Sequence, residues 1–409
     1  MNIKNMDINL IQPYLNNPRK NQPIEKVAKS IKEYGFQQPI VVDKDMVVIV
    51  GHTRLQAAKT LDIKEVPVLI ADLDAEKTKA YRIADNRTNQ DADWDIDLLE
   101  GEIKELFQSE YNLDNLGFSA DEIADFLYEP TEGLTDEDAV PEVPSEPVSV
   151  LGDVWVLGEH RILCGDCTEQ TSVDNLMQGQ KADLVFTDPP YNVDYSGRGN
   201  NNLGKIKNDS MSNDQFDEFL ADVFTGYSSV MKPLSCIYVC HPDGKTNEKV
   251  SFELAFKNYF YKSCTIIWVK QSAGMGWQDY RAQHEPILYG WKEGNGKHFF
   301  INDRTKTTVW QIGRDVQKDY VHPTQKPVAL IEEAILNSSK GDDIVLDFFG
   351  GSGSTLIGAE KTKRKSYIME LDEKYVDVMI KRWQNFTGNN AKHEKTGKTF
   401  IEMSNFRGI

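Results

Sequence analysis

The sequence has few cysteines and no long apolar run. Its five cysteines lack paired spacing, and Cys164 and Cys167 form a single Cys-x-x-Cys pair. A zinc site of this type needs a second pair, so we expect reduced thiols and no metal. No stretch reaches the length of a membrane-spanning helix, and the start lacks the apolar core of a signal peptide. We therefore expect a cytoplasmic protein with no membrane segment.

The sequence also lacks the net positive charge that is common in DNA-binding proteins. Its 409 residues include 46 Lys and Arg against 64 Asp and Glu, a formal net charge of -18. The excess lies in residues 91–148, which hold 19 acidic residues and 1 basic residue. Residues 1–90 hold 14 basic and 11 acidic residues, and residues 149–409 hold 31 and 34. Local basic patches outside the acidic segment can therefore still neutralise phosphates.

An apolar strand pattern at residues 183–187 runs into Asp188, Pro189, Pro190 and Tyr191. Prolines cannot continue a sheet, so the chain turns out and presents Asp188 and Tyr191 at the strand end. A carboxylate and a carbonyl placed there can accept both hydrogens of an aromatic amine and localise its lone pair for attack on a methyl group. Asp188 and the Pro189 carbonyl are the candidates, and Tyr191 offers a ring face to a base. The alternative is a simple proline turn.

A second pattern lies at residues 344–355, where a buried strand meets a glycine-rich turn and a helix that begins near Ser354. Such a turn lets the backbone approach a nucleotide-like cofactor closely. A further strand, residues 365–369, ends at Glu370, about twenty positions after the glycines, where a carboxylate can accept from ribose hydroxyls. Between the two patterns stands the run His322-Pro323-Thr324-Gln325-Lys326-Pro327.

Taken together and in this order, the three motifs resemble the beta class of DNA amino methyltransferases, over roughly residues 148–387. The resemblance implies an α/β fold with a Rossmann-like, circularly permuted sheet and S-adenosylmethionine as cofactor. It implies methyl transfer to adenine N6 of a base flipped out of double-stranded DNA, and a homodimer. Cytosine N4 needs the same two acceptors and is the alternative, although Asp at the first motif position favours adenine. RNA as substrate and an inert methyltransferase half also stay open.

The resemblance also assigns roles to individual residues. The catalytic set is Asp188, Pro189, Pro190 and Tyr191. The cofactor set is Asp166, Thr324, Lys326, Asp347, Phe349, Gly351, Gly353, Ser354, Thr355 and Glu370. Within it, Asp166 approaches the adenine, unless it is only a turn residue at its strand end. Thr324 and Lys326 meet the methionine end, where the lysine pairs with the carboxylate.

Residues 292–320 interleave basic side chains such as Lys292 with aromatic ones such as Trp310. This mixture suits phosphates and base edges, so we expect target recognition here, with a long irregular hairpin as the alternative. The predicted DNA contacts are Lys205, Trp277, Arg281, Arg304, Lys306 and Arg314. A place in the core is the alternative for Trp277.

The first ninety residues alternate short strands and helices, with helices predicted at 23–34 and 55–61 and strands at 39–42 and 47–50. Gly51, His52 and Arg54 stand at the start of the second helix. A glycine and an arginine at a helix start can bind a phosphate or another anion. This region resembles the small α+β N-terminal domain of ParB and sulfiredoxin, in which Asn86 and Arg87 would be a second nucleotide-contacting element. His52 and Thr53 depart from the usual ParB pattern, so a structural or protein-docking role is the alternative.

Residues 91–149 contain two helical patterns with acidic polar faces, followed by a stretch rich in Pro and Glu from residue 129. We interpret that stretch as an extended, solvated spacer. The alternative is an arm that repels DNA or occupies the protein's basic cleft when DNA is absent.

The predicted domains are thus residues 1–90, residues 91–149 and residues 150–409.

Overall fold

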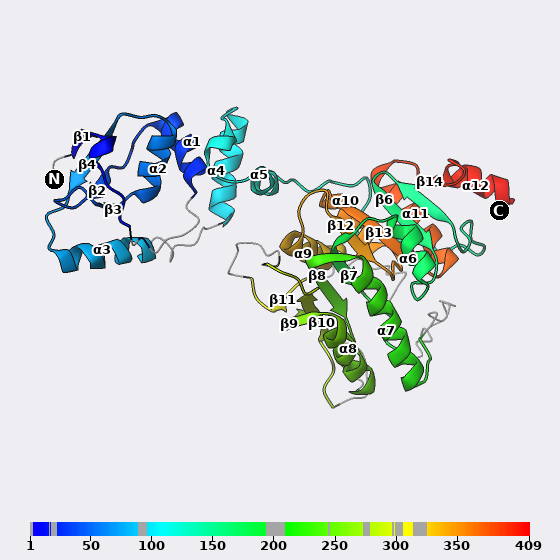
Figure 1. Ribbon diagram of the computed structural model, residues 1–409. Coiled ribbons are helices and arrows are strands. Elements are labelled where there is room, and N and C mark those ends of the chain that lie inside the picture. Colours follow the sequence, from blue (N-terminus) through cyan, green and yellow to red (C-terminus); the bar gives the residue numbers. More distant parts are fainter. Residues whose placement is uncertain are drawn as a thin grey trace. The chain divides into compact units, whose positions relative to one another are not determined.

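The computed structural model describes residues 3–15, 17, 23–88, 96–193, 209–243, 246–272, 279–296, 298, 306–313 and 325–409. The chain forms two compact units, Met1–Tyr128 and Glu129–Ile409 (Figure 1).

The first unit contains a four-stranded sheet with the strand order β1-β4-β2-β3. Its elements are β1 (Ile3–Asp7), η1 (Ile8–Leu10), α1 (Ile24–Tyr34), β2 (Ile40–Val42), β3 (Val48–Val50), α2 (His52–Thr60), β4 (Glu65–Ile70) and α3 (Ala75–Thr88). Apolar residues of β2, β3, α2 and β4 are buried together, and α1 buries Ala28 and Ile31, one turn apart on one face. The small α+β domain and the helices and strands predicted within it are confirmed.

Three short helices complete this unit: α4 (Ile96–Gln108), η2 (Leu113–Asn115) and α5 (Ala120–Phe126). A capping box precedes α5, because Glu122 N–H donates to Ser119 Oγ at 3.2 Å and Ser119 N–H donates to Glu122 Oε2 at 2.6 Å. The Tyr111 hydroxyl lies 2.5 Å from that of Tyr34 on α1.

The second unit is built on a ten-stranded sheet in the order β11-β9-β10-β8-β7-β12-β13-β6-β5-β14. Its strands are β5 (Val154–Leu157), β6 (His160–Cys164), β7 (Ala182–Thr187), β8 (Met231–Cys240), β9 (Tyr261–Val269), β10 (His284–Trp291), β11 (Val309–Trp310), β12 (Ile344–Asp347), β13 (Lys365–Glu370) and β14 (Lys392–His393). The five strands from β8 to β6 are parallel, whereas β10 is antiparallel to β8 and β9.

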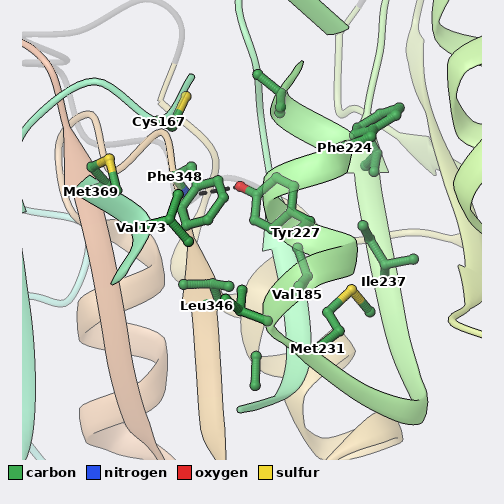
Figure 2. Close-up of a cluster of buried hydrophobic side chains, with 14 of the residues drawn as sticks. Cys167, Val173, Val185, Phe224, Tyr227, Met231, Ile237, Leu346, Phe348 and Met369 are labelled. Atoms are coloured by element: carbon green, nitrogen blue, oxygen red, sulfur yellow. Dashed lines mark hydrogen bonds between the residues drawn. The ribbon is translucent and has the colours of Figure 1, made fainter. Parts of the chain in front are cut away.

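Helices cover both faces of this sheet (Figure 1). They are α6 (Gln170–Met177), α7 (Asn213–Val230), α8 (Thr246–Tyr259), α9 (Val328–Ser338), α10 (Ser354–Lys361), α11 (Glu373–Thr387) and α12 (Phe400–Arg407). Val185 of β7 packs with α6, α7 and α8 in one buried cluster (Figure 2). Its neighbours Leu184 and Phe186 pack with α9 and α10 in another. Because alternate residues face opposite sides and both sides are covered, the middle of β7, Leu184, Val185 and Phe186, is entirely apolar.

The circularly permuted sheet predicted from the motif order is confirmed. Strands β7 and β12 are parallel neighbours, with Leu346 opposite Val185, although β7 comes much earlier in the chain. From β7 the chain runs through α7 to β8, and from β12 it runs through α10 to β13, on the other side. A crevice for ligands forms where neighbouring strands lead away in opposite directions, outside their carboxyl ends.

Residues 129–149, called the strap below, pack on the rest of the second unit. Leu134 N–H donates to the Phe386 carbonyl at 2.7 Å, and Thr131 N–H donates to the Lys361 carbonyl at 3.0 Å. Val148 N–H donates to the buried Asp377 carboxylate at 2.6 Å. The strap is extended, as predicted, but its interpretation as a solvated spacer is wrong.

No helix among the described residues is long and apolar enough to cross a membrane. Within the same residues, no group of three or more His, Cys, Asp or Glu side chains is arranged to hold a metal ion. All five cysteines are free thiols. The tail after Gly388, which had no predicted element, adds β14 and α12 to the edge of the sheet.

Candidate active site

The Asp188 carboxylate lies at the carboxyl end of β7, and both of its oxygens have partners. The Tyr191 hydroxyl donates to Asp188 Oδ1 at 2.7 Å, and Lys326 Nζ donates to Asp188 Oδ2 at 2.6 Å. Among the residues that the structure describes, none donates a hydrogen bond to the carbonyl of Pro189. One carboxylate and one open carbonyl thus stand together at the end of the strand.

A chain of hydrogen bonds ties the end of β7 to the end of β12. Phe348 N–H donates to the Tyr227 hydroxyl at 2.7 Å (Figure 2). The Tyr227 hydroxyl donates to Thr187 Oγ1 at 2.7 Å, and Thr187 Oγ1 donates to Asp347 Oδ1 at 3.1 Å. Because Thr187 directly precedes Asp188, this chain holds Asp188 in register with the glycine turn that follows β12.

Two carboxylates shape the glycine turn. Asp347 accepts from Thr355 Oγ1 at 2.7 Å and from Phe349 N–H at 3.0 Å. Glu370, at the end of β13, accepts from Gly351 N–H at 2.8 Å and from Asp372 N–H at 2.9 Å. These bonds order the backbone where a cofactor must approach it closely.

The glycines of this turn are needed for different reasons. Gly353 has φ 87°, a conformation that side chains disfavour, and it caps α10. A Cβ on Gly350 would lie 2.5 Å from Ile368 Cγ2 and 2.7 Å from Met379 Sδ. The turn therefore packs directly on β13 and α11.

Burial sets the protonation of these acids. It raises the pKa of Asp347 to about 6 and that of Glu370 to about 7. Burial, with the nearby Asp188 charge, also raises the pKa of Tyr191, so its hydroxyl stays a neutral donor. Both carboxylic acids are thus poised to respond to a ligand that favours their ionised form.

The Lys326 ammonium, predicted to pair with the cofactor's carboxylate, faces the carboxylates of Asp188 and Glu285. Lys326 Nζ lies 3.2 Å from Glu285 Oε2, and Glu285 also pairs with Lys270. Burial lowers the pKa of Lys326, but the two carboxylates outweigh it and raise that pKa. Burial raises the pKa of Glu285, but Lys326 and Lys270 outweigh it and hold that pKa at about 2. Sequence reasoning missed Glu285, which carries no local motif.

Asp166 lies at the end of β6, beside Glu370. Gly165 N–H donates to the Glu370 carbonyl at 2.9 Å, which brings the two strand ends together. Asp166 Oδ1 accepts from Thr168 N–H at 2.9 Å and from Thr168 Oγ1 at 2.7 Å. The residue therefore serves as a turn residue with one of its oxygens, next to the predicted cofactor site.

The predicted DNA contacts are only partly described. Arg281 is exposed, and Lys306 pairs with Glu333 of α9 at 2.8 Å. Lys205, Trp277, Arg304 and Arg314 lie outside the described residues, as does the predicted cofactor residue Thr324.

Two residues of the predicted recognition segment face the protein. Trp310 is 7% exposed and packs with Tyr238, so its expected role on a DNA-facing surface is wrong. Lys292 Nζ donates to the carbonyls of Ser228, with a short contact, and of Met231 at 3.2 Å. Aromatic and basic residues in a mixed run are thus divided between core and surface by the fold.

The predicted anion residues of the first unit line a cavity. Its wall includes Gly51, His52 and Arg54 together with Asn115 and Gly117, so both the β-sheet domain and the segment after α4 contribute. Gly51 has φ 104° at the start of α2. Asn86 and Arg87 belong to α3, but their side chains lie outside the described residues.

Two of these side chains hold the cavity wall. Arg54 Nη1 donates to the Pro39 carbonyl at 2.7 Å and the Gln38 carbonyl at 3.2 Å. His52 Nε2 accepts from Tyr14 N–H at 3.2 Å, and burial, followed by the charge of Arg82, lowers its pKa. This shift favours the neutral imidazole, so the positive charge of the cavity wall comes from Arg54 and Lys26.

Comparison with known proteins agrees with the geometry at Asp188 and the glycine turn. Residues 182–382 match the family model described as DNA methylase. The chain therefore carries a DNA methylase domain. Residues 1–87 match the ParB N-terminal domain, and residues 97–151 match the ParB-methyltransferase HTH domain. The predicted DNA amino methyltransferase with a ParB-like N-terminal region is thereby confirmed.

The methylase is similar to several named proteins. It is 28% identical over 234 residues to the DNA adenine methyltransferase YhdJ of Escherichia coli, covering 50% of this chain and 76% of the relative. It is 28% identical over 260 residues to the type II methyltransferase M.HinfI of Haemophilus influenzae, covering 56% and 69%. Among solved structures, the M1.HpyAVI-SAM complex is 24% identical, with a TM-score of 0.39, and covers 54% of this chain and 98% of its own.

The helix-turn-helix match was not foreseen in the sequence, because this segment is so acidic. Residues 91–148, which include most of it, hold 19 acidic residues and 1 basic residue. Proteins that grip DNA phosphates do so with Lys and Arg. The charge of this segment therefore opposes a direct grip on the DNA backbone.

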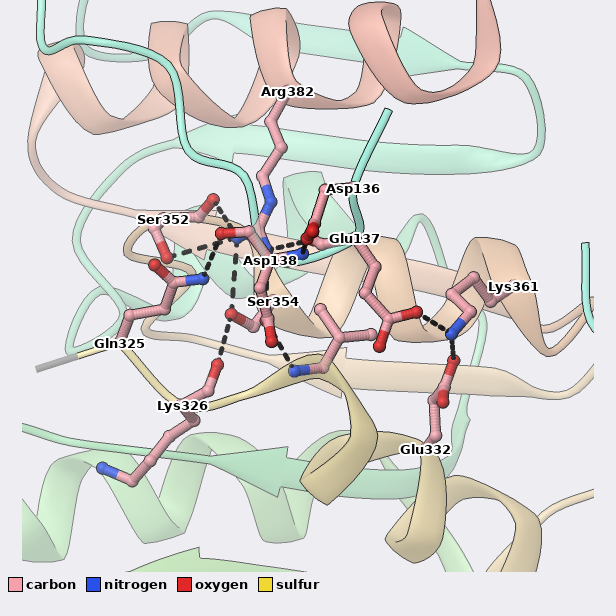
Figure 3. Close-up of polar contacts among 11 residues, drawn as sticks. Asp136, Glu137, Asp138, Gln325, Lys326, Glu332, Ser352, Ser354, Lys361 and Arg382 are labelled. Atoms are coloured by element: carbon pink, nitrogen blue, oxygen red, sulfur yellow. Dashed lines mark hydrogen bonds and ion pairs between the residues drawn. The ribbon is translucent and has the colours of Figure 1, made fainter. Parts of the chain in front are cut away.

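Polar contacts join the strap to the glycine turn and to the start of α9 (Figure 3). Arg382 of α11 is 2% exposed, and it donates to the Glu137 carbonyl of the strap at 2.6 Å and to the Ser352 carbonyl of the glycine turn at 2.9 Å. Asp138 accepts from Val328 N–H at 3.0 Å, at the start of α9. One buried guanidinium thus joins the strap to the turn.

Replacing Asp138 with alanine is expected to lower the free energy of unfolding by about 1 to 3 kcal/mol. The change removes the acceptor for Val328 N–H and the carboxylate 3.9 Å from Arg382 Nη2. Urea unfolding of the whole chain measures the effect, and Glu132→Ala, on an exposed part of the strap, is the matched control. Equal unfolding midpoints for the two variants would contradict a supporting role for Asp138.

Proposed function

We propose that the chain transfers a methyl group from S-adenosylmethionine to the N6 amine of adenine in DNA. The observation that carries this is the placement of Asp188 and Pro189 at the end of β7, which hydrogen bonds join to the glycine turn after β12. Aspartate at the first position of the motif favours adenine over cytosine N4. The name of the similar protein YhdJ, a DNA adenine methyltransferase, supports the same choice.

The residues around the glycine turn fit S-adenosylmethionine. Each oxygen of the Glu370 carboxylate accepts one backbone N–H and keeps a lone pair for a ribose hydroxyl. Phe349 is half-buried beside the turn, and Asp166 stands next to Glu370. We assign the cofactor to these residues and to the predicted Asp347, Gly351, Gly353, Ser354 and Thr355. When bound, it supplies an electrophilic methyl group.

The residues at the end of β7 prepare the amine. An exocyclic amine is a weak nucleophile because its lone pair is delocalised into the ring. Asp188 and the Pro189 carbonyl each accept one N–H of the amine, which leaves the lone pair on nitrogen for the methyl group. Because a stacked base cannot reach this pocket, the target must swing out of the helix, where Tyr191 contacts it. Asp188 then takes part in removing the surplus proton from the methylated nitrogen.

The product identifies the reaction. Unmethylated plasmid DNA is incubated with the purified chain and S-adenosylmethionine, digested to nucleosides and examined by mass spectrometry. We expect N6-methyladenine. N4-methylcytosine would overturn the base assignment, and methylation of RNA in place of DNA would overturn the substrate class. Absence of any methylated nucleoside would refute the proposed activity.

We assign target recognition to residues 292–320 and to the exposed Arg281. The support is the position of this segment, between the catalytic and cofactor halves, and its basic and aromatic composition. Lys306 is freed for DNA only if its ion pair with Glu333 opens. Arg281→Ala is tested by DNA binding at several salt concentrations, where loss of a phosphate contact lowers the salt dependence.

The cavity of the first unit supports a nucleotide as a further partner. It is lined by Gly51 at the start of α2, and a helix start favours anions. Calorimetric titration with CTP and with ATP tests this assignment, and no heat from either nucleotide would remove it in favour of a structural or protein-docking role.

We also propose a homodimer, as the resemblance to the beta class implies. A monomer in analytical ultracentrifugation would contradict it.

A further inference from the structure

The Lys326 ammonium occupies the place that an incoming amine needs. Its Nζ donates to Asp188 Oδ2 at 2.6 Å and to the Tyr191 hydroxyl at 3.4 Å. It also lies 5.5 Å from the centre of the Tyr191 ring, and its side chain is 9% exposed. An ammonium and an exocyclic amine both present N–H donors, so they compete for the same acceptor.

Both oxygens of Asp188 already have a donor. The Tyr191 hydroxyl donates to Oδ1 at 2.7 Å, and Lys326 donates to Oδ2 at 2.6 Å. Each oxygen keeps a second lone pair, but the ammonium also lies over the Tyr191 ring, where the base must stack, so the ammonium has to move when the base enters. Moving the ammonium away from every carboxylate would leave a buried charge unpaired, which is strongly unfavourable.

Glu285 offers the ammonium a second position. Its Oε2 is 3.2 Å from Lys326 Nζ, and no other residue that the structure describes donates a hydrogen bond to this buried atom. Its other oxygen, Oε1, pairs with Lys270 of β9. Glu285 Oε2 is thus a buried acceptor beside the ammonium, ready to form a full hydrogen bond.

We propose that Lys326 holds the amine position on Asp188 in the empty enzyme and passes to Glu285 when the target base enters. This inference rests on the proposed methyl transfer and adds Glu285 to it as a positioning residue that acts through Lys326. The exchange trades one charge-assisted hydrogen bond for another, so the ammonium stays paired throughout. Asp188 meanwhile stays paired with a cation until its substrate arrives.

The backbone around the lysine is fixed, so the exchange involves the side chain. Ser354 Oγ donates to the Lys326 carbonyl at 2.8 Å, and the next residue but one begins α9. The long lysine stem can swing its ammonium between two carboxylates that it already approaches. A base without an exocyclic amine gains nothing from displacing the ammonium, so the same device disfavours such a base.

Glu285→Gln tests the proposal in the full chain. The amide keeps the shape but weakens the second position, so the ammonium stays on Asp188. We expect kcat/KM for unmethylated plasmid DNA to fall about tenfold or more, as is typical when a group that orients another is lost. The affinity for S-adenosylmethionine, measured by calorimetry, should not change. The matched control is Glu253→Gln on α8, which removes the ion-pair partner of Lys262 on β9. Unchanged DNA kinetics in Glu285→Gln would overturn the proposal.

The double variant Lys326→Met, Glu285→Gln separates this role from a merely structural one. If Glu285 acts through Lys326, the Glu285→Gln loss disappears in the Lys326→Met background. Losses that simply multiply would overturn the proposal. Weaker binding of S-adenosylmethionine by Lys326→Met would also overturn it, because the lysine would then be a cofactor ligand.

If Glu285→Gln does not fold, Glu285→Asp, which withdraws the carboxylate by one methylene, carries the same expectation. A wild-type chain that methylates nothing refutes the proposed function instead.

Discussion

Replacing Asp188 with alanine is expected to reduce methyl transfer to DNA by a factor of about 10² to 10³ or more, with cofactor binding retained. The change removes one of the two acceptors that localise the lone pair of the target amine. The fold should survive, because Lys326 still has Glu285 Oε2 at 3.2 Å, and Thr187 still ties β7 to Asp347. Single-turnover methylation of plasmid DNA measures the chemical step, and calorimetry measures cofactor binding.

The matched control for Asp188→Ala is Asp174→Ala, which removes an exposed carboxylate from α6. That variant should methylate at the wild-type rate. Asp188→Asn keeps one acceptor oxygen and the shape of the side chain, so its rate should fall between those of Asp188→Ala and the wild type. An Asp188→Ala enzyme that retains the wild-type single-turnover rate would remove Asp188 from the mechanism.

The parts of the site that the sequence predicted are those whose chemistry is local. The strand before Asp188 is apolar because both faces of β7 are covered, and the prolines after it end the strand. The turn at Gly351 and the acid at Glu370 follow from spacing within one strand-helix-strand unit. Neighbouring parallel strands then bring these two motifs to the same edge of the sheet.

The parts that the sequence did not predict depend on distant partners. Lys326 is 138 positions from Asp188, and Glu285 stands in a strand with no motif around it. A lysine in a cofactor-type motif was therefore assigned to the cofactor. Its side chain instead lies between two half-buried carboxylates, whose attraction outweighs the cost of burying the ammonium.

Composition misled in two places. The strap is rich in Pro and Glu, which is typical of a solvated spacer, yet its backbone finds partners at Phe386 and Lys361. Its acidic residues form ion pairs with Lys361 and Arg382. In the sequence these two basic residues look like solvent-exposed charges on helices. Trp310, in a basic run, is buried by β9. A pattern of residue types shows what a segment can bind but not which side of it faces the core.

Glu370→Gln is expected to weaken S-adenosylmethionine binding by about 10- to 100-fold, the range for hydrogen bonds to a charged group. The carboxylate can accept from two ribose hydroxyls while it holds Gly351 N–H and Asp372 N–H. An amide has one acceptor oxygen, and its NH2 group faces one of these backbone donors. Calorimetric titration at pH 8, where Glu370 is ionised, measures the loss. Glu373→Gln, which changes a nearby carboxylate in the first turn of α11, is the control.

The same residue predicts a pH dependence with a definite sign. Burial raises the pKa of Glu370 from its ordinary value of 4.5 to about 7, so the folded chain holds a proton there that the unfolded chain has released. Its contribution to stability is therefore complete below about pH 4.5 and is lost as the pH rises to about 7. In that window the free energy of unfolding of the ligand-free wild type should fall relative to that of Glu370→Gln.

Because ribose hydroxyls donate to the ionised form of Glu370, the affinity of the wild type for S-adenosylmethionine should instead rise from pH 6 to pH 8. The part of that rise due to Glu370 should vanish in the variant, leaving any part due to Asp347, whose pKa is about 6. An affinity with the same pH profile in both proteins would mean that Glu370 orders the turn without meeting the ribose.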